Sequence, residues 1–433
     1  MVKVLSLFDG MACGMIAMQL AGVEVESYDA YEIDKYAIKT AQHNFPMIKE
    51  HGDVFDADFT QYEGVDFLIG GSPCTYWSIA QTKNRETVAS GMGWELFSQY
   101  VRALREAKPK YFIYENNKSM SRQIRASIDA TFGFESVLIN SALVSAQNRQ
   151  RLYWVGKRND DGTYSKVMVD QPEDRGILLR DILETGIAWH EKSYCITATE
   201  YKGSNPQQTL TKHRRTMVAE PIEYIDYVPR KNSHIVVNEN AIRCAQNKNN
   251  ASCAESFVEF VDKKSQTLIA GRVNKIIIPD MPAKEATVKG YTEIECGKCV
   301  DLSMPNSKTR RGRSMADKAN CMQTSNDFYQ YVGYAIEFDD EGKPIKAIGK
   351  DGKEITIYEV RNGLITIKGK QYPIKLVDGY YIIRKLTVRE CMRLQTVPEW
   401  YEFPVSDSQA YKMLGNGWTC EVIAHLIRSA IDA

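Results

Sequence analysis

The chain has 433 residues, and its 55 lysines and arginines balance 55 aspartates and glutamates, so the formal net charge is zero. Overall charge therefore predicts neither a nucleic-acid partner nor a membrane-surface partner, and any polyanion would have to meet local basic patches. With 43% hydrophobic and 25% charged residues, the composition is globular and excludes disordered and collagen-like chains. The length suffices for two domains or for one domain with a large insertion.

The sequence also disfavours a membrane protein and a metalloprotein. No stretch approaches the roughly 18 apolar residues that a membrane span needs, and Asp9 comes too early for a signal peptide. Ten cysteines at irregular intervals are typical of free thiols in a reducing compartment. Cys296 and Cys299 form the only CxxC pair, and no second pair or nearby histidine completes a zinc site. We therefore expect an intracellular protein without a metal.

The first part of the chain alternates short apolar runs with helical patterns, which favours βαβ units around a parallel sheet. Strands are expected at 2–8, 25–31, 65–69, 111–114, 138–144 and 152–155, and helices at 14–21, 35–44, 95–107 and 122–131. The pattern predicts an α/β fold with a doubly wound, mostly parallel sheet over residues 1–157.

The rest of the chain has a different character. Residues 158–384 are polar, turn-rich and poor in helical periodicity, which indicates a second, β-rich domain. Within it, three dipeptides lie between alternating apolar and polar runs and predict β-hairpins. They are Asp351-Gly352, Asn362-Gly363 and Asp378-Gly379. Residues 385–433 return to amphipathic helical patterns, and we expect this segment to pack back on the first domain.

Polar residues follow several of the expected strands, and ligands of open parallel sheets bind beyond these carboxyl ends. Asp9, Gly10 and Gly14 follow the first strand in the loop FDGMACG, and Glu32 follows the second. A glycine-containing turn with an acid about twenty positions on is typical of a site where the acid binds a ribose. Asp53 follows the third strand and is either an acceptor for an adenine amino group or a helix cap.

A thiol and a carboxyl follow the next two strands. Cys74 ends the segment GGSPC directly after the apolar run VDFLI. A cysteine on a glycine-rich loop at a strand end can be nucleophilic, whereas an isolated cysteine is more often a small buried hydrophobe. Glu115 ends the run KYFIY, and its alternative role is that of a solvated loop acid. Together they predict a nucleophile beside a proton donor in one cleft.

Six short segments occur in a fixed order along the chain, namely FDGMACG, GGSPC, YENN, AQNRQRLYWVG, LTVRECMRLQTVP and AYKMLGNG. In order and spacing they resemble the motifs of the DNA cytosine-5 methyltransferases, over about residues 1–157 and 385–433. The forms GGSPC and LFDG are more similar to the de novo class and to phage-encoded relatives than to enzymes with GGFPCQ. The resemblance implies the S-adenosylmethionine-dependent methyltransferase fold, with residues 158–384 as a target-recognition domain. It also implies a monomeric enzyme in the cytoplasm of a bacterium or a phage-infected host cell.

The activity implied by the resemblance is methyl transfer from S-adenosylmethionine to C5 of a cytosine flipped out of double-stranded DNA. Cys74 would add to C6 while Glu115 assists at N3, with no metal required. Arg149 and Arg151 would contact the flipped nucleotide and the adjoining phosphate; their alternative is a pair of exposed arginines before a strand. The cofactor would contact eight residues: Phe8 at the adenine, Asp9, Gly10 and Gly14 at the methionine end, Glu32 at the ribose, Asp53 at the adenine edge, and Leu96 and Asn416 elsewhere in the pocket.

Three positions depart from the family's usual pattern. Asn117 is the third residue of the ENV motif, the late motif reads Gly415-Asn416-Gly417 where a serine is usual, and Ser72 replaces a common phenylalanine. No departure removes a group that performs chemistry, but Asn117 adds a polar side chain near the predicted pocket.

The region 158–384 contains the local basic patches that a DNA partner would need, KHRR at 212–215 and KTRRGR at 308–313. Such loops contact phosphates when they bind DNA, and otherwise they are solvated. The arginines expected to contact DNA, and to face the same cleft as Cys74, are Arg214, Arg215, Arg310, Arg311 and Arg313.

Three other functions compete with this reading. Transfer-RNA cytosine-5 methyltransferases share the motif set, although the large middle domain favours DNA. A non-catalytic DNA-binding homologue should have lost Cys74, Glu115 or the FDGMACG loop, all of which are present. A free-nucleotide methylase would use related thiolate chemistry but would not need so large a second domain.

Overall fold

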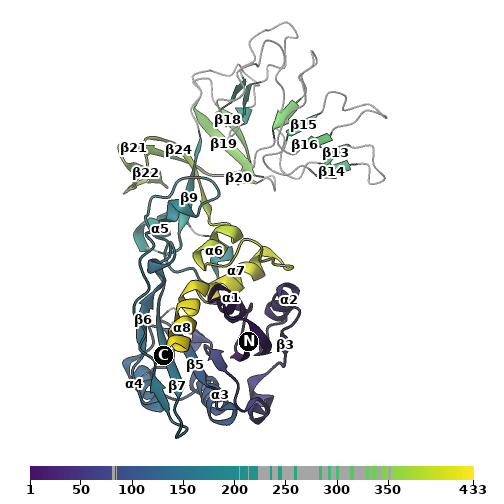
Figure 1. Cartoon of the computed structure of the whole chain (residues 1–433). Helices are drawn as coiled ribbons and strands as arrows, with labels where there is room; N and C mark the ends of the chain where they lie inside the picture. Colours follow the sequence, from purple (N-terminus) through teal and green to yellow (C-terminus); the bar gives the residue numbers. More distant parts are fainter. Residues whose placement is uncertain are drawn as a thin grey trace.

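The structure is a computed structural model of the chain and describes residues 1–79, 83, 85–203, 205–212, 214–222, 343–349 and 353–433, with the backbone of short strands between 235 and 338. Figure 1 shows a large sheet with its helices at one end of the molecule. A smaller sheet lies beyond helices α6 (Val388–Leu394) and α7 (Asp407–Asn416).

The large sheet has the strand order β3-β2-β1-β4-β5-β7-β6, with β8 paired to β7. The strands from β3 to β5 pair in parallel, and β6, β7 and β8 join them antiparallel. This confirms the predicted doubly wound, mostly parallel sheet. The strands are β1 (Val2–Leu7), β2 (Val25–Tyr31), β3 (Lys49–Glu50), β4 (Phe67–Gly70), β5 (Tyr111–Asn117), β6 (Val137–Asn140), β7 (Gln150–Arg158) and β8 (Tyr164–Lys166).

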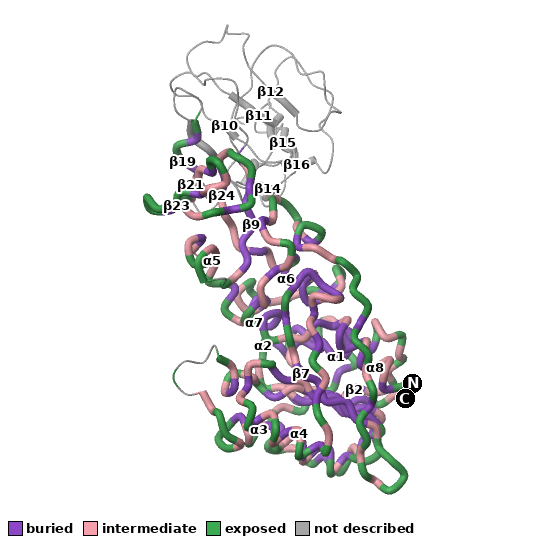
Figure 2. Tube along the Cα trace, turned by 90° about the vertical axis from the view of Figure 1, so that its left-hand side faces the viewer, coloured by how far each residue is buried: buried purple, intermediate pink, exposed green. Residues whose placement is uncertain are grey.

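Helices cover both faces of this sheet and create two hydrophobic cores. On one face lie α1 (Cys13–Leu20), α2 (Lys35–Asn44) and α8 (Cys420–Asp432), and on the other lie α3 (Met92–Ala107) and α4 (Arg122–Phe132). The strands are buried on both sides, which explains why they read as continuous apolar runs. Figure 2 shows the buried residues concentrated along this sheet and its helices.

The C-terminal segment contributes directly to the core on the α1 side. Residues of α8, among them Ile423 and Ile427, are fully buried in the same cluster as α1. The Tyr401 hydroxyl donates to the Met11 carbonyl at 2.6 Å, and Arg428 donates to the Leu20 carbonyl at 2.9 Å. Residues nearly 400 positions apart in sequence therefore close one core and hold the loop before α1.

The smaller sheet has the antiparallel order β23-β22-β21-β24-β9. Asn362 and Gly363 have φ angles of 52° and 69°, as a two-residue hairpin requires, and they join β21 to β22 as predicted. Asp378-Gly379 forms no hairpin, because β23 and β24 are not neighbours, so that prediction is wrong. Asp351-Gly352 lies outside the described residues. The strands are β9 (Met217–Ile222), β21 (Ile357–Arg361), β22 (Leu364–Ile367), β23 (Lys370–Pro373) and β24 (Gly379–Lys385).

Besides short 3₁₀ helices, the remaining elements are α5 and a group of short strands. They are α5 (Pro206–Lys212), β10 (Ile235–Val236), β11 (Ile242–Ala245), β12 (Val258–Phe260), β13 (Pro282–Lys284), β14 (Tyr291–Glu293), β15 (Cys299–Asp301), β16 (Arg313–Met315), β17 (Phe328–Gln330), β18 (Tyr334–Phe338), β19 (Pro344–Gly349) and β20 (Glu354–Ile355). Within the part of the chain that the structure describes, no helix is both long and apolar enough to cross a bilayer.

Candidate active site

Cys74 lies at the carboxyl end of β4, as the sequence predicts, and is the first residue of a 3₁₀ helix that ends at Tyr76. Its carbonyl accepts hydrogen bonds from the backbone N–H groups of Trp77 at 3.1 Å and Ser78 at 2.9 Å. The residue is half-buried, and its thiol is free. The backbone of Cys74 is thus held firmly in a residue that remains partly exposed to solvent.

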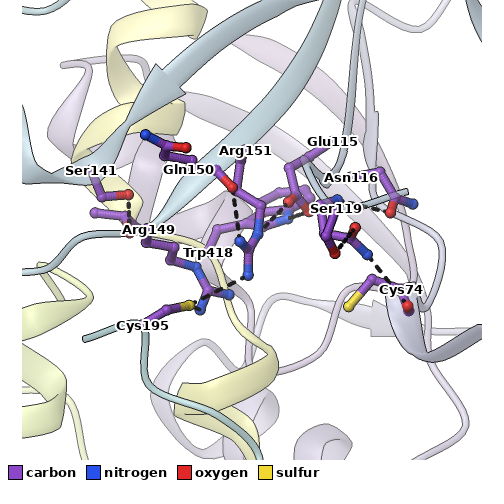
Figure 3. A network of polar contacts seen from close by, with 12 residues as sticks. Cys74, Glu115, Asn116, Ser119, Ser141, Arg149, Gln150, Arg151, Cys195 and Trp418 are labelled. Carbon is purple, nitrogen blue, oxygen red and sulfur yellow. Dashed lines mark hydrogen bonds and ion pairs between the residues drawn. The ribbon is translucent and has the colours of Figure 1, made fainter. Parts of the chain in front are cut away.

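Glu115 lies on β5, the parallel neighbour of β4, one residue beyond the register pair of Gly70 and Tyr114. A Cβ atom on Gly71 would lie only 2.9 Å from Oε2 of Glu115. The glycine in the GGSPC segment therefore lets the carboxyl group lie directly against the loop that carries Cys74. The two predicted groups are brought together at neighbouring strand ends, and Figure 3 shows both in one polar network.

Two side chains fix the Glu115 carboxyl group. The Arg151 guanidinium lies 3.1 Å from Oε1 in an ion pair, and the indole N–H of Trp418 donates to Oε2 at 2.9 Å. Burial alone would lower the pKa of Arg151, but its interactions with the neighbouring Cys195, Glu115 and Cys74 side chains raise it. Arg151 therefore stays charged beside the carboxyl group, which both donors hold in one orientation.

Arg149 is more deeply buried than Arg151, because only 4% of the residue is exposed and its contacts lie within the protein. It donates to the carbonyls of Ile196, Gly415 and Gly417 at 3.3, 3.3 and 2.7 Å. These bonds tie three chain segments together at the edge of the site. The contact of Arg149 with a flipped nucleotide stays a prediction, and the observed bonds give it a positioning role.

Cys195 lies beside both arginines and was not predicted from the sequence. Its Sγ is 3.3 Å from Nη1 of Arg149 and 3.8 Å from Nη2 of Arg151 (Figure 3). Burial raises the pKa of the Cys195 thiol, but the two guanidinium groups outweigh it and lower the pKa below its ordinary value. A thiol with a lowered pKa thus lies in the network that orients Glu115.

The structure explains two departures from the usual motifs. Asn117 is buried, and its amide donates to the Cys74 carbonyl at 3.4 Å while its oxygen accepts from Ser119 at 2.9 Å. The hydroxyl of Ser72 lies 2.7 Å from that of Tyr114, deep in the core. Both polar side chains tie the end of β5 to the loop that carries Cys74, in place of the apolar contacts their usual counterparts would make.

A second group of polar residues surrounds the loop after β1. Glu32 accepts the backbone N–H of Gly10 at 2.8 Å, so the predicted acid holds the predicted glycine loop. Asp9 is buried, and one of its oxygens accepts from the hydroxyls of Ser6 at 2.5 Å and Tyr28 at 2.6 Å. Its other oxygen, Oδ2, is buried without a hydrogen-bond partner.

Glu50, on β3, adds a third carboxyl group that the sequence did not predict. Both of its oxygens are buried without a partner. Burial, reinforced by the charges of Asp9 and Glu32, raises the pKa of Glu50 to about 8, and burial raises that of Asp9 to about 6. Buried carboxylate oxygens without a partner destabilise the charged form of the group. The cluster of Asp9, Glu32 and Glu50 therefore suits a cationic ligand, and without one its buried carboxyl groups tend to retain their protons.

We expect Glu50→Gln to stabilise the ligand-free protein at high pH. A carboxyl group whose folded-state pKa is raised from 4.5 to about 8 destabilises the fold progressively as the pH rises through that range. Because part of Glu50 is exposed and solvent screens the repulsion, we expect roughly 1 kcal/mol, or about 2–4 °C in unfolding temperature for a domain of this size. Calorimetry at pH 9 and pH 5 measures the difference.

The matched control for this variant is Glu95→Gln, since Glu95 is exposed on α3. Glu95→Gln should unfold like the wild type at both pH values. A Glu50→Gln protein that is no more stable than the wild type at pH 9 would contradict the repulsion between these carboxyl groups.

The structure places the other predicted cofactor residues as follows. Phe8 has a left-handed backbone with φ of 58°. Gly14 is packed tightly, because an added Cβ would lie 2.3 Å from Cδ1 of Ile69. Asp53 caps a 3₁₀ helix by accepting from the Phe55 N–H at 3.0 Å. Leu96 lies half-buried in α3, and Asn416 is the exposed last residue of α7. Their contacts with a cofactor stay predictions.

The predicted DNA-contact arginines are only partly described. Arg214 is exposed, and Arg215 donates to the Gly203 carbonyl and, at 2.9 Å, to the Thr199 hydroxyl. Arg215 is thus bonded to the chain segment that carries Cys195. Arg310 and Arg311 lie outside the described residues, as does the side chain of Arg313, whose backbone begins β16.

The described residues contain no cluster of three or more histidine, cysteine, aspartate or glutamate side chains suited to a metal ion. The side chains that surround the site come from six separate parts of the chain. They are the loop after β1, the loop after β4, the end of β5, the start of β7, the segment 191–199, and the turn between α7 and α8.

Comparisons with known proteins identify the family of this chain. The family model of the C-5 cytosine-specific DNA methylases matches residues 2–432. The orphan methyltransferase M.SPRI of Bacillus phage SPR is 24% identical over 99% of this chain and 97% of its own. The type II methyltransferase M.BanI of Aneurinibacillus aneurinilyticus is 24% identical over 98% of this chain and 95% of its own. The solved structure of DNMT2 from Spodoptera frugiperda aligns over the whole of both chains with 13% identity and a TM-score of 0.47. Because the family model spans nearly the whole sequence, the chain belongs to the family of C-5 cytosine-specific DNA methylases.

Proposed function

We propose that this protein transfers a methyl group from S-adenosylmethionine to C5 of a cytosine flipped out of duplex DNA. The observation that carries the proposal is the convergence of Cys74 and Glu115 from the neighbouring strands β4 and β5, with Glu115 packed against Gly71. A nucleophilic thiol beside an oriented carboxyl group suits addition to C6 with assistance at N3. Membership of the family supports cytosine as the base and C5 as the ring position that takes the methyl group.

The proposed reaction uses the chain's own groups in order. The Cys74 thiolate forms a bond to C6, and the electron pair of the C5–C6 double bond moves toward N3, where Glu115 supplies a hydrogen bond or a proton. C5 then becomes nucleophilic and can take a methyl group. A base from the solvent takes the proton from C5, which restores the double bond, breaks the bond between sulfur and C6, and releases Cys74, while N3 returns its proton to Glu115.

Arg151 and Trp418 serve this reaction by fixing Glu115. They occupy different oxygens of its carboxyl group, at 3.1 and 2.9 Å, so the group cannot rotate away from the pocket without losing one of them. Preorganised donors of this kind cost no rearrangement during the reaction. We assign Arg151 to the flipped nucleotide as well, because its side chain keeps 15% of its surface exposed, whereas the more deeply buried Arg149 acts as a positioning residue.

The loop after β1 fits the cofactor that the family implies. Gly10 has φ of 63° and open space where a side chain would lie, so its backbone can approach a ligand closely. The unpartnered oxygens of Asp9 and Glu50 suit the positive charges of S-adenosylmethionine. We assign its binding to Phe8, Asp9, Gly10 and Glu32, with Asp53, Leu96 and Asn416 around them. When bound, the cofactor supplies an electrophilic methyl group on a positively charged sulfur.

C6 of a stacked cytosine is inaccessible, so the base has to leave the helix before Cys74 can reach it. We propose that residues 1–157 and 385–433 form the catalytic unit and that residues 158–384 read the DNA sequence. The smaller sheet supports this division, because Arg384 on β24 pairs with Glu220 on β9 at 2.6 Å and with Glu390 on α6 at 2.8 Å. These ion pairs join the sheet to the helices that lead back to the catalytic unit.

Two experiments test the proposed function. Transfer of a labelled methyl group from S-adenosylmethionine should occur to duplex DNA and not to transfer RNA. Bisulfite sequencing of DNA from cells that express the protein should then show methylated cytosines in one sequence context. Methylation of transfer RNA alone, or no methylated cytosine in the DNA, would overturn the proposal.

A further inference from the structure

A pocket next to the Arg151–Glu115 ion pair is lined almost entirely by hydrogen-bond donors. It has a volume of about 350 Å³ and is formed by Asn117, Lys118, Ser119, Gln150 and Arg151. β5 and β7 pair antiparallel with Asn117 opposite Arg151, so the end of one strand and the start of the other meet at this pocket. The lining contains an ammonium, a guanidinium, two amides and a hydroxyl, and no carboxyl group.

Within the described part of the chain, the positive charge of Lys118 is not paired with a carboxylate. Its ammonium group donates to Oε1 of Gln150 at 2.6 Å, which is a neutral partner. Among the residues that the structure describes, no carboxylate lies within ion-pair distance of Lys118. The bond to Gln150 holds the ammonium group against another residue of the pocket lining and leaves its charge available to an anion.

The pocket is also coupled to the reacting groups. Asn117 donates to the Cys74 carbonyl at 3.4 Å, and Arg151 pairs with Glu115 at 3.1 Å. Any anion held here lies beside a base whose C6 faces Cys74. In duplex DNA, the anion nearest to a target base is a phosphate of its own strand, and charged donors are its usual partners.

We propose that Lys118 and Gln150 bind a backbone phosphate of the target strand next to the flipped cytosine. This inference rests on the proposed function and deepens it, because it adds Lys118 and Gln150 to the phosphate contact that the family resemblance gave to Arg149 and Arg151 alone. Lys118 would act through charge and Gln150 through its amide donors. A contact to the backbone positions the nucleotide without reading its sequence.

The first test compares Lys118→Gln with Lys39→Gln, which removes the same charge from the exposed face of α2, beside β2 and β3. Fluorescence anisotropy measures binding of duplex DNA as a function of salt concentration. Lys118→Gln should reduce the slope of log K against log salt by about 0.9, the value for one phosphate contact, and weaken binding about threefold to tenfold at low salt. Lys39→Gln and Lys118→Arg should keep the wild-type slope.

The second test identifies the phosphate. Single neutral methylphosphonates replace, one at a time, the phosphates that flank the methylated cytosine. One of them should weaken wild-type binding and have no further effect on Lys118→Gln, as a double-mutant cycle shows for two partners of one contact. Additive effects at every flanking phosphate, or an unchanged salt slope in Lys118→Gln, would overturn this inference. The wild-type protein should methylate the same DNA. If it does, either contradicting result counts against the phosphate contact of Lys118 and not against the proposed function.

Discussion

Replacing Cys74 by alanine is expected to abolish methyl transfer to DNA, with a loss of roughly 10⁴-fold or more. The thiol supplies the only bond to C6 in the proposed reaction, and without that bond C5 stays too electron-poor to take a methyl group. Cys74 is a half-buried residue held through backbone bonds to Trp77 and Ser78, so the variant should fold. Incorporation of a labelled methyl group into duplex DNA measures the effect.

Serine at position 74 should be nearly as inactive as alanine, because its hydroxyl is a far weaker nucleophile than a thiolate. Both variants should still bind S-adenosylmethionine and duplex DNA, which checks that the fold and the pockets survive. Turnover within tenfold of the wild type in either variant would rule out the covalent role of Cys74.

Replacing Glu115 by glutamine is expected to lower kcat by about 10²-fold to 10⁴-fold, the usual contribution of a positioned acid. The glutamine oxygen can still accept one of the two hydrogen bonds from Arg151 and Trp418, but the side chain cannot deliver a proton to N3. Single-turnover kinetics with saturating cofactor and DNA isolates this step. Cofactor affinity should change little, because Glu115 lies outside the group formed by Asp9, Glu32 and Glu50.

Glu95→Gln is the matched control, since it removes an exposed carboxyl group from α3 without touching the network. It should retain wild-type kcat. A Glu115→Gln protein whose single-turnover rate lies within a few-fold of the wild type would show that the carboxyl group does not assist at N3.

The parts of the site that follow strands could be predicted from the sequence. Cys74, Glu115 and Glu32 each follow an expected strand, and parallel strands deliver their carboxyl ends to one edge of the sheet. The order of the motifs then indicated the family. The structure adds the reason for Gly71 in the GGSPC segment, because a side chain there would collide with Glu115.

The supporting side chains could not be predicted in the same way. Trp418 is 303 residues from Glu115, and Cys195 is 46 residues from Arg149. Such contacts depend on how distant segments pack, which no local pattern encodes. Glu50 lies on a strand of two residues, too short to show an alternating or apolar pattern, so its burial beside Asp9 left no signal in the sequence.

Turn chemistry was informative at one position and misleading at another. Asn362-Gly363 adopts the left-handed backbone of a tight hairpin. Asp378-Gly379 leads instead into β24, which pairs with β21 and β9 rather than with the preceding strand. The hairpin between β22 and β23 uses Lys368-Gly369, with φ of 50° and 74°, and a lysine at such a position is an unusual turn residue.

The most direct test of the proposed chemistry is covalent trapping with DNA that contains 5-fluorocytosine at the methylated position. After methyl transfer, fluorine in place of the C5 hydrogen prevents the final proton removal, so the bond between Cys74 and C6 should persist. Mass spectrometry of the digested complex should find the adduct on the peptide that contains Cys74, and Cys74→Ala should give none. Absence of an adduct with DNA that the wild type methylates, or an adduct at Cys195 instead, would contradict the assignment of Cys74 as the nucleophile.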